Sequence, residues 1–197
     1  MKHSSIWKKE TSMNENFEIP GDWKWREKLF EKSDRSIMLY YEPIAVAKIK
    51  MLLYTHDKEI GWNMVVKPFK AGYKIYDVVV YPQNPSPAFV GVDLPKYGLW
   101  KASLDDDVEA NLFGHGHSHV NMGVMASSID IEQQKQEIET KGKGFFLFQI
   151  YNKDLKCNSF LYDLNKGVYY PNEKIIHMTD FEGMDDFVKE SFEMAKE

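Results

Sequence analysis

The segment GHGHSHVNMGVMASSID, residues 114–130, carries three histidines at alternating positions and ends in an aspartate. Imidazole nitrogens and carboxylate oxygens are ligands that zinc takes in proteins. If the segment around the histidines is an extended strand, their side chains point to one face, with neighbouring positions about 6.7 Å apart. Two neighbouring histidines can therefore share one ion, and the segment predicts a metal site.

His115, His117 and His119 cannot all reach one tetrahedral ion. Two nitrogens bound to the same zinc lie about 3.3 Å apart, whereas positions 115 and 119 start about 13 Å apart on a straight strand. One of the two outer histidines must therefore be left out of the ligand set.

The later Ser127 and Asp130 have an interpretation of their own, because a serine followed three residues later by an acid also marks the start of a helix. Combined with the histidines, they give the spacing His-Ser-His, seven residues, Ser, two residues, Asp. This combined spacing is much more specific than either half.

Residues 117–130 resemble, without a gap, the His-(Ser/Thr)-His-x7-Ser-x-x-Asp signature of the JAMM (MPN+, or JAB) zinc metallopeptidases. That family also has a glutamate after its first helix, and Glu59 in THDKEIGW stands at the corresponding place. The order of the expected elements over roughly residues 36–165 is similar to that of prokaryotic and phage-type members.

The resemblance implies that His117, His119 and Asp130 bind one zinc ion per chain, with water in the fourth position. Three protein ligands and a water are typical of catalytic zinc, whereas structural sites are usually closed by four protein ligands. It also implies that Glu59 takes the proton of that water and later returns it to the leaving amine. Ser127 would hydrogen-bond the oxyanion as hydroxide attacks a carbonyl. Zinc lowers the pKa of its water towards about 7, so a carboxylate of ordinary basicity suffices as the base.

The remaining histidines and the single cysteine lie outside this signature. We expect His115 to pack beside the ligands, ligation being the alternative, and His56 to lie exposed at a helix end, since the His-Glu-x-x-His motif is absent. His3, His177 and Cys157 have no partner pattern. One cysteine is also too few for a zinc nucleobase deaminase.

The expected activity is therefore zinc-dependent hydrolysis of peptide or isopeptide bonds. By resemblance, the substrate is a protein with a flexible C-terminal tail, possibly ubiquitin-like, which adds as a strand at PAFVGVD (87–93). This stretch is equally a short core strand. Only KGKG (141–144) separates the aspartate-bearing helix from the next expected strand, FFLFQIY (145–151). This leaves no room for the insertion that members cleaving ubiquitin chains often carry there. The alternatives are a non-catalytic MPN-type assembly scaffold, or a metallohydrolase of the same fold acting on another peptide or a small molecule.

The amino-acid composition limits the classes of protein to which this chain can belong. The 197 residues are 43% hydrophobic, enough for one globular core, and the formal net charge of −5 without a basic cluster disfavours nucleic acid and anionic membranes as partners. One cysteine precludes an intramolecular disulfide. The first residues lack the apolar stretch of a secretory signal, and no run of 18 apolar residues occurs, so we expect a cytoplasmic protein. The oligomeric state is not predicted.

The pattern of apolar and turn residues predicts an α/β fold, a mixed sheet flanked by helices in a three-layer α-β-α core similar to JAMM and cytidine deaminase cores. We expect residues 36–170 to form this metallopeptidase-like domain. Residues 1–35 would be an N-terminal appendage that packs on it, and residues 171–197 a C-terminal strand and amphipathic helix.

Individual elements follow from local patterns. The expected elements are a helix from Pro43, strands on both sides of KAG (70–72), a short strand in AFVGVD (88–93), a strand through the histidines, a helix that starts at Ser127 and ends before Gly142, and the strands FFLFQIY (145–151) and CNSFLYD (157–163). In the first helix, the expected buried face is Ile44, Ala47, Met51 and Leu52. We expect Asp105, Asp106 and Asp107 in a solvated loop, with a surface for a basic partner as the alternative.

Overall fold

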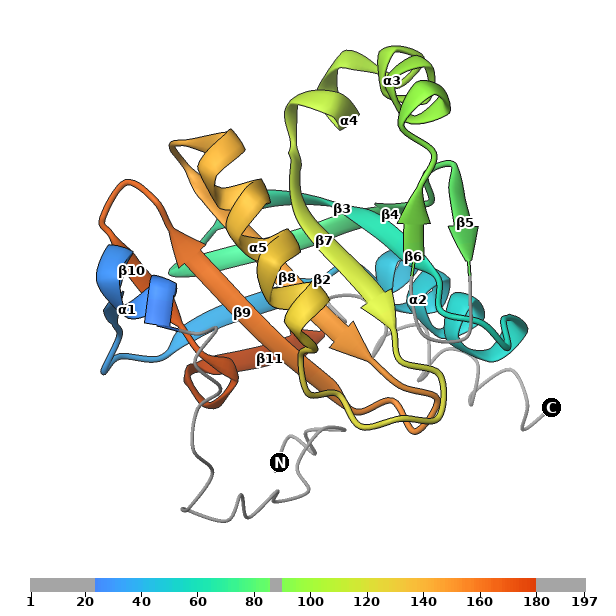
Figure 1. The fold of residues 1–197 in the computed structure, drawn as a ribbon. Helices are drawn as coiled ribbons and strands as arrows, with labels where there is room; N and C mark the ends of the chain where they lie inside the picture. Colours follow the sequence, from blue (N-terminus) through green and yellow to red (C-terminus); the bar gives the residue numbers. More distant parts are fainter. Residues whose placement is uncertain (1–23, 86–89, 180–197) are drawn as a thin grey trace, which may run out of the picture.

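The computed structural model describes residues 24–85 and 90–179, and these form a curled mixed sheet with helices packed on it (Figure 1). The sheet has nine strands in the order β1-β10-β9-β8-β7-β3-β4-β2-β11. Its strands are β1 (Glu31–Lys32), β2 (Ile37–Tyr41), β3 (Gly61–Phe69), β4 (Gly72–Val79), β7 (Leu112–Ser118), β8 (Phe145–Tyr151), β9 (Cys157–Asp163), β10 (Val168–Tyr170) and β11 (Ile175–Thr179). The predicted α/β fold class is confirmed.

The other elements lie around this sheet. A separate antiparallel pair consists of β5 (Gln83–Pro85) and β6 (Val90–Val92). The helices are α1 (Lys24–Leu29), α2 (Pro43–Thr55), α3 (Leu94–Ala102), α4 (Asp106–Ala110) and α5 (Ser128–Lys141), with a 3-10 turn at Asn172–Lys174. Among the described residues, no helix has both the length and the apolarity needed to span a membrane.

Strand β8 shows that the sheet is covered on both faces. All seven of its residues are buried, and successive side chains of a strand point to opposite faces. Phe145 and Leu147 belong to a core cluster that includes Ile49 of α2. Phe146 belongs to a second cluster that includes Ile138 of α5. The two helices therefore lie on opposite faces of the sheet.

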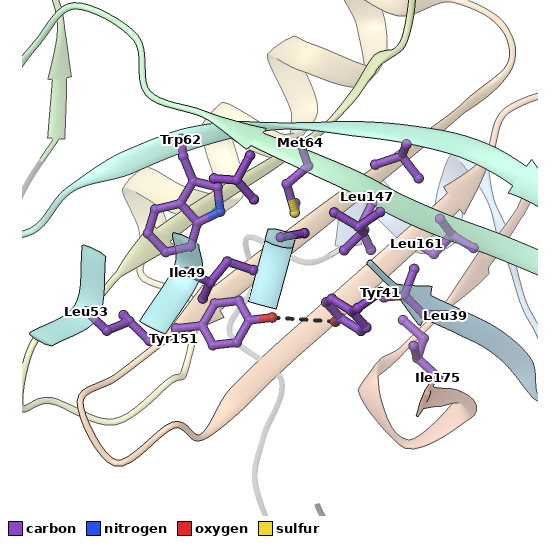
Figure 2. Packing of buried hydrophobic residues seen from close by; sticks show 14 of the residues in the cluster. Leu39, Tyr41, Ile49, Leu53, Trp62, Met64, Leu147, Tyr151, Leu161 and Ile175 are labelled. Carbon is purple, nitrogen blue, oxygen red and sulfur yellow. Dashed lines mark hydrogen bonds between the residues drawn. The ribbon is translucent and has the colours of Figure 1, made fainter. Parts of the chain in front are cut away.

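The curl of the sheet brings non-neighbouring strands together around the first cluster (Figure 2). The hydroxyl of Tyr41 on β2 lies 3.4 Å from that of Tyr151 on β8. Strand β11 pairs in parallel with β2, with Ile175 opposite Ile37. The last described strand thus pairs with one from the start of the described chain.

Helix α2 forms where it was predicted, but its buried face is different. The predicted face was Ile44, Ala47, Met51 and Leu52. The structure instead buries Ala45, Ile49 and Leu53, and leaves Ile44 54% and Met51 65% exposed. Apolar residues surround most of this helix, so their spacing fits several faces equally well. Contact with the sheet decides which face is buried.

Most other elements agree with the sequence, and the region after β6 does not. The antiparallel β3–β4 pair, β7, β8, β9 and α5 are all present. Helix α3 was not expected from the sequence. Asp105–Asp107 are exposed as expected, but the loop conformation expected there is wrong because α4 begins at Asp106. Acidic residues in the first turn favour a helix start. The helix predicted within 181–197 lies outside the described residues.

The described part of the expected N-terminal appendage packs against the sheet. Strand β1 pairs with β10, and Phe30 belongs to the second core cluster. The Arg26 guanidinium lies 4.5 Å from the centre of the Phe160 ring and 5.3 Å from that of Tyr162. The Arg26 side chain also donates a hydrogen bond of 3.2 Å to Gln134 of α5. The segment from α1 to β1 therefore completes the core beneath α5.

The glycines of β7 have a steric cause. Strand β7 lies between β3 and β8, and Gly116 lies opposite Trp62, whose side chain is fully buried. A Cβ at residue 116 would come within 2.4 Å of the Trp62 ring nitrogen. Histidines therefore occupy one face of β7, while the other face at residue 116 has room for a glycine alone.

We predict that Gly116→Ala lowers the free energy of unfolding by about 1–3 kcal/mol, as overpacking of a core does. The buried Trp62 ring would have to shift to make room for the added methyl group. Urea titration followed by circular dichroism would measure this. Gly98→Ala is the control, because nothing lies within 4 Å of its added Cβ and alanine favours a helix. Equal effects of the two substitutions would contradict the steric explanation.

Candidate metal centre

The three residues predicted to bind metal come together where β7 ends and α5 begins. His117 is on β7, His119 follows the strand directly, and Asp130 is in the first turn of α5. Each offers one ligand atom, and these atoms all lie within 4.8 Å of one another. His117 Nε2 is 3.0 Å from Asp130 Oδ1, and His119 Nε2 is 3.4 Å from Asp130 Oδ2.

The start of α5 fixes the position of Asp130. The backbone N–H of Ser127 donates to Asp130 Oδ2 at 2.6 Å, and the backbone N–H of Asp130 donates to Ser127 Oγ at 3.3 Å. This reciprocal pair is a capping box. The helix-capping interpretation of Ser127 and Asp130 is thus correct, and the cap also turns the carboxylate towards the histidines.

His119 is held with one defined nitrogen towards Asp130. Its Nδ1 lies 2.8 Å from the carbonyl oxygen of Gly123. A carbonyl can only accept, so Nδ1 carries the hydrogen, and a neutral His119 keeps the lone pair of Nε2 on the side of Asp130. Histidines that bind metals commonly donate their second ring N–H in this way.

Electrostatics around Asp130 favour a positive charge in the gap between the three groups. Burial alone would raise the pKa of Asp130, but His117 and His119 hold it well below its ordinary value. For His119, burial lowers the pKa, and the interactions with Asp130 and Gly123 outweigh this and raise it. Positive charge on or between the two imidazoles thus stabilises the ionised form of Asp130.

The donor set fits a zinc ion. His117 Nε2 is buried and makes no hydrogen bond, although it is 3.0 Å from Asp130 Oδ1. Buried polar atoms are nearly always satisfied, and a bound cation would satisfy this one. The separations of 3.0 and 3.4 Å are close to the roughly 3.3 Å expected between two ligand atoms of tetrahedral zinc. Two imidazoles and one carboxylate could therefore hold the ion.

Glu59 and Ser127 line the same cleft as the three possible ligands. Glu59, in the segment between α2 and β3, is only 4% exposed, and burial raises its pKa despite the nearby His119 and His117. The cleft has a volume of about 340 Å³. Its other lining residues are His115, Met122, Gly123, Met125, Ile129 and Gln133. The five predicted site residues thus share one cleft.

His115 lies beside the centre with a different partner. Its side chain is buried, and its Nε2 is 2.9 Å from the hydroxyl of Tyr81. Burial, with His117 next to it, lowers the pKa of His115 to about 3. A packed His115 beside the candidate ligands is the role expected from the sequence. Tyr81 was not expected, because it precedes His115 by 34 residues and no local pattern connects them.

The other singled-out residues lie away from the cleft. His56 is exposed at the end of α2, as expected. No sequence pattern indicated partners for His177 and Cys157, and in the fold each has a hydrogen-bond partner outside the cleft. His177 Nδ1 is 2.7 Å from the Tyr41 hydroxyl, and Cys157 Sγ is 3.2 Å from Ser159 Oγ. His177 meets Tyr41 because β11 pairs with β2, whereas Cys157 and Ser159 are two residues apart on the same face of β9. His3 lies outside the described residues.

Comparison with known proteins adds no assignment: no family model matches the chain, and neither does any curated protein. The interpretation of the cleft therefore depends on its own residues and their geometry.

We predict that His117→Ala and His119→Ala each abolish most zinc binding, whereas His115→Ala retains about one zinc per chain. Each of the first two removes a ligand from a set of three, while the third removes only the partner of Tyr81. Zinc would be measured by atomic emission on the purified full chain. His115→Ala should lower the free energy of unfolding by about 1–3 kcal/mol, because a buried hydroxyl loses its partner. Equal zinc loss in all three variants would contradict the ligand assignment.

Proposed function

We propose that the protein is a zinc-dependent hydrolase of peptide or isopeptide bonds. The observation that carries this proposal is the shared cleft: His117, His119 and Asp130 converge in it, and Glu59 and Ser127 line it with them. A site that only stabilises a fold needs no additional acid or base in an open cleft. The resemblance of residues 117–130 to the JAMM signature supports the same conclusion independently of the geometry.

Glu59 has the properties of a general base. A zinc ion held by the three ligands would supply a water of lowered pKa and polarise the substrate carbonyl. Burial raises the pKa of Glu59, so this carboxylate holds a proton more firmly than an exposed one. Glu59 would accept a proton from the water as the bond is attacked and deliver it to the leaving amine.

Ser127 has a hydroxyl available for the substrate. Its Oγ accepts a hydrogen bond from the backbone N–H of Asp130, and the hydroxyl hydrogen, which rotates, can turn from the Asp130 carboxylate to a substrate. Ser127 is exposed and lines the cleft. The hydroxyl can therefore donate to the carbonyl oxygen of a bound amide, where negative charge develops.

The substrate class follows from the resemblance. We propose a protein with a flexible C-terminal tail, possibly ubiquitin-like, that adds as a strand alongside β6, whose pairing with β5 uses one of its sides. The cytoplasmic location and the absence of nucleic-acid partners remain predictions from the sequence.

Glu59→Gln tests the base. The substitution should leave zinc content and melting temperature nearly unchanged, because the amide has the same shape and Glu59 is not a ligand. It should lower hydrolysis by about 10²–10⁴-fold, since an amide cannot accept the proton. The assay uses ubiquitin-like fusions and isopeptide-linked reporters, with chelation and zinc add-back as controls. If the wild-type chain binds zinc but cleaves none of these reporters, an assembly scaffold becomes the better interpretation.

For Ser127, glycine is a sharper substitution than alanine, because the hydroxyl both caps α5 and faces the cleft. At an N-cap, glycine costs only a few tenths of a kcal/mol, compared with about 1 kcal/mol for alanine. We predict that Ser127→Gly keeps zinc and nearly all stability while the rate falls by about 10²–10³-fold, as for other lost oxyanion donors. An unchanged rate would restrict Ser127 to capping the helix.

A further inference from the structure

The loop between His119 and α5, residues 120–126, starts from a strained backbone. Val120 has a φ of 46°, in the left-handed region that β-branched residues rarely adopt. Such a conformation costs about 1–3 kcal/mol and persists only where surrounding contacts impose it. Here the carbonyl of Val120 accepts a hydrogen bond of 2.8 Å from the backbone N–H of Lys153, just after β8.

Two asparagine side chains hold the rest of the loop. Asn152 Nδ2 donates to the Met122 carbonyl at 3.1 Å, and Asn158 Nδ2 donates to the Val124 carbonyl at 3.0 Å. Asn152 is itself fixed, because its Oδ1 accepts from the backbone N–H of Lys156. The loop backbone is thus attached to the β8–β9 hairpin at several points, and these hydrogen bonds hold its conformation.

This fixed backbone presents apolar side chains next to the candidate metal ligands. Met122 is 47% exposed, Met125 57% and Ile129, in the first turn of α5, 53%. All three line the cleft that contains His117 and Asp130. Grouped exposed apolar side chains that line a cleft are a feature of ligand-binding grooves. None of the described residues lining this cleft is a lysine or arginine that would bind a carboxylate.

We propose that Met122, Met125 and Ile129 form a subsite for an uncharged, apolar side chain of the substrate, next to the bond that is cleaved. The proposal rests on the function proposed above and specifies its substrate. Methionine side chains are flexible and polarisable, so the subsite adapts to aliphatic and aromatic groups of different shape. The attached loop backbone fixes the position of the substrate side chain. The flexible methionines accept side chains of different shape at that position.

Two isosteric hydroxamates test the subsite without any need for catalysis. The probes are 4-methylpentanohydroxamic acid and N-hydroxybutanediamide, in which a carboxamide replaces the terminal isopropyl group. Both present the same metal-binding group to the zinc-loaded full chain. We expect calorimetry to show at least about tenfold tighter binding of the apolar probe, a difference of about 1.4 kcal/mol.

Substitutions assign this preference to the loop. The double variant Met122→Gln with Met125→Gln should reduce the preference by about tenfold, with zinc content unchanged, because glutamine has nearly the length of methionine but a polar end. Met51→Gln is the matched control, since Met51 is an exposed methionine on α2 outside the cleft, and should leave the preference intact.

The outcomes separate this proposal from the function beneath it. Equal affinity of the two probes for the zinc-loaded chain, or an undiminished preference in the double variant, would overturn the subsite and leave the hydrolase intact. A wild-type chain that takes up no zinc would overturn the proposed function, and the subsite with it. Measuring zinc in every sample tells these cases apart.

Discussion

A carboxylate removed from water needs positive charge or hydrogen-bond donors around it, and the arrangement of this cleft depends on how Asp130 meets that need. Asp130 is about nine-tenths buried, in the first turn of α5. The backbone N–H of Ser127 donates a hydrogen bond to Oδ2 of Asp130. The imidazole of His117 lies beside Oδ1, and that of His119 lies beside Oδ2. The start of α5 must therefore lie beside the end of β7, and the cleft is the result.

Strand β7 is suited to this role by its place in the sheet. It pairs with β3 on one side and with β8 on the other, so its backbone is held along both edges. The face that carries the histidines meets α5, while Gly116 on the opposite face meets Trp62. One constraint is chemical and the other steric, and the alternation of histidine and glycine satisfies both. A site on such a strand has little freedom to move relative to its neighbours.

Sequence was sufficient where local chemistry decides the outcome. Ser127 and Gly142 marked the ends of α5 because capping and a left-handed backbone depend on single residues. The grouping of His117, His119 and Asp130 was implied by the resemblance of residues 117–130 to a metallopeptidase signature. Contacts between distant segments were not accessible. The buried face of α2, the partnership of Tyr81 with His115 and the attachment of loop 120–126 by Asn152 all arise from tertiary packing, and nothing in the local pattern specifies them.

The pairing of β11 with β2 has a consequence for how the chain is made. Ile175 of β11 lies opposite Ile37 of β2, and the ribosome adds Ile175 long after Ile37. Strands β3 to β9, which include β7 with its histidines, are complete once Asp163 has been added. Domains tend to fold as they emerge, and until β11 follows, β2 offers unpaired N–H and C=O groups along one edge. The strands around the histidines can therefore assemble first, while β2 keeps an unpaired edge that favours aggregation until β11, the last described strand, covers it.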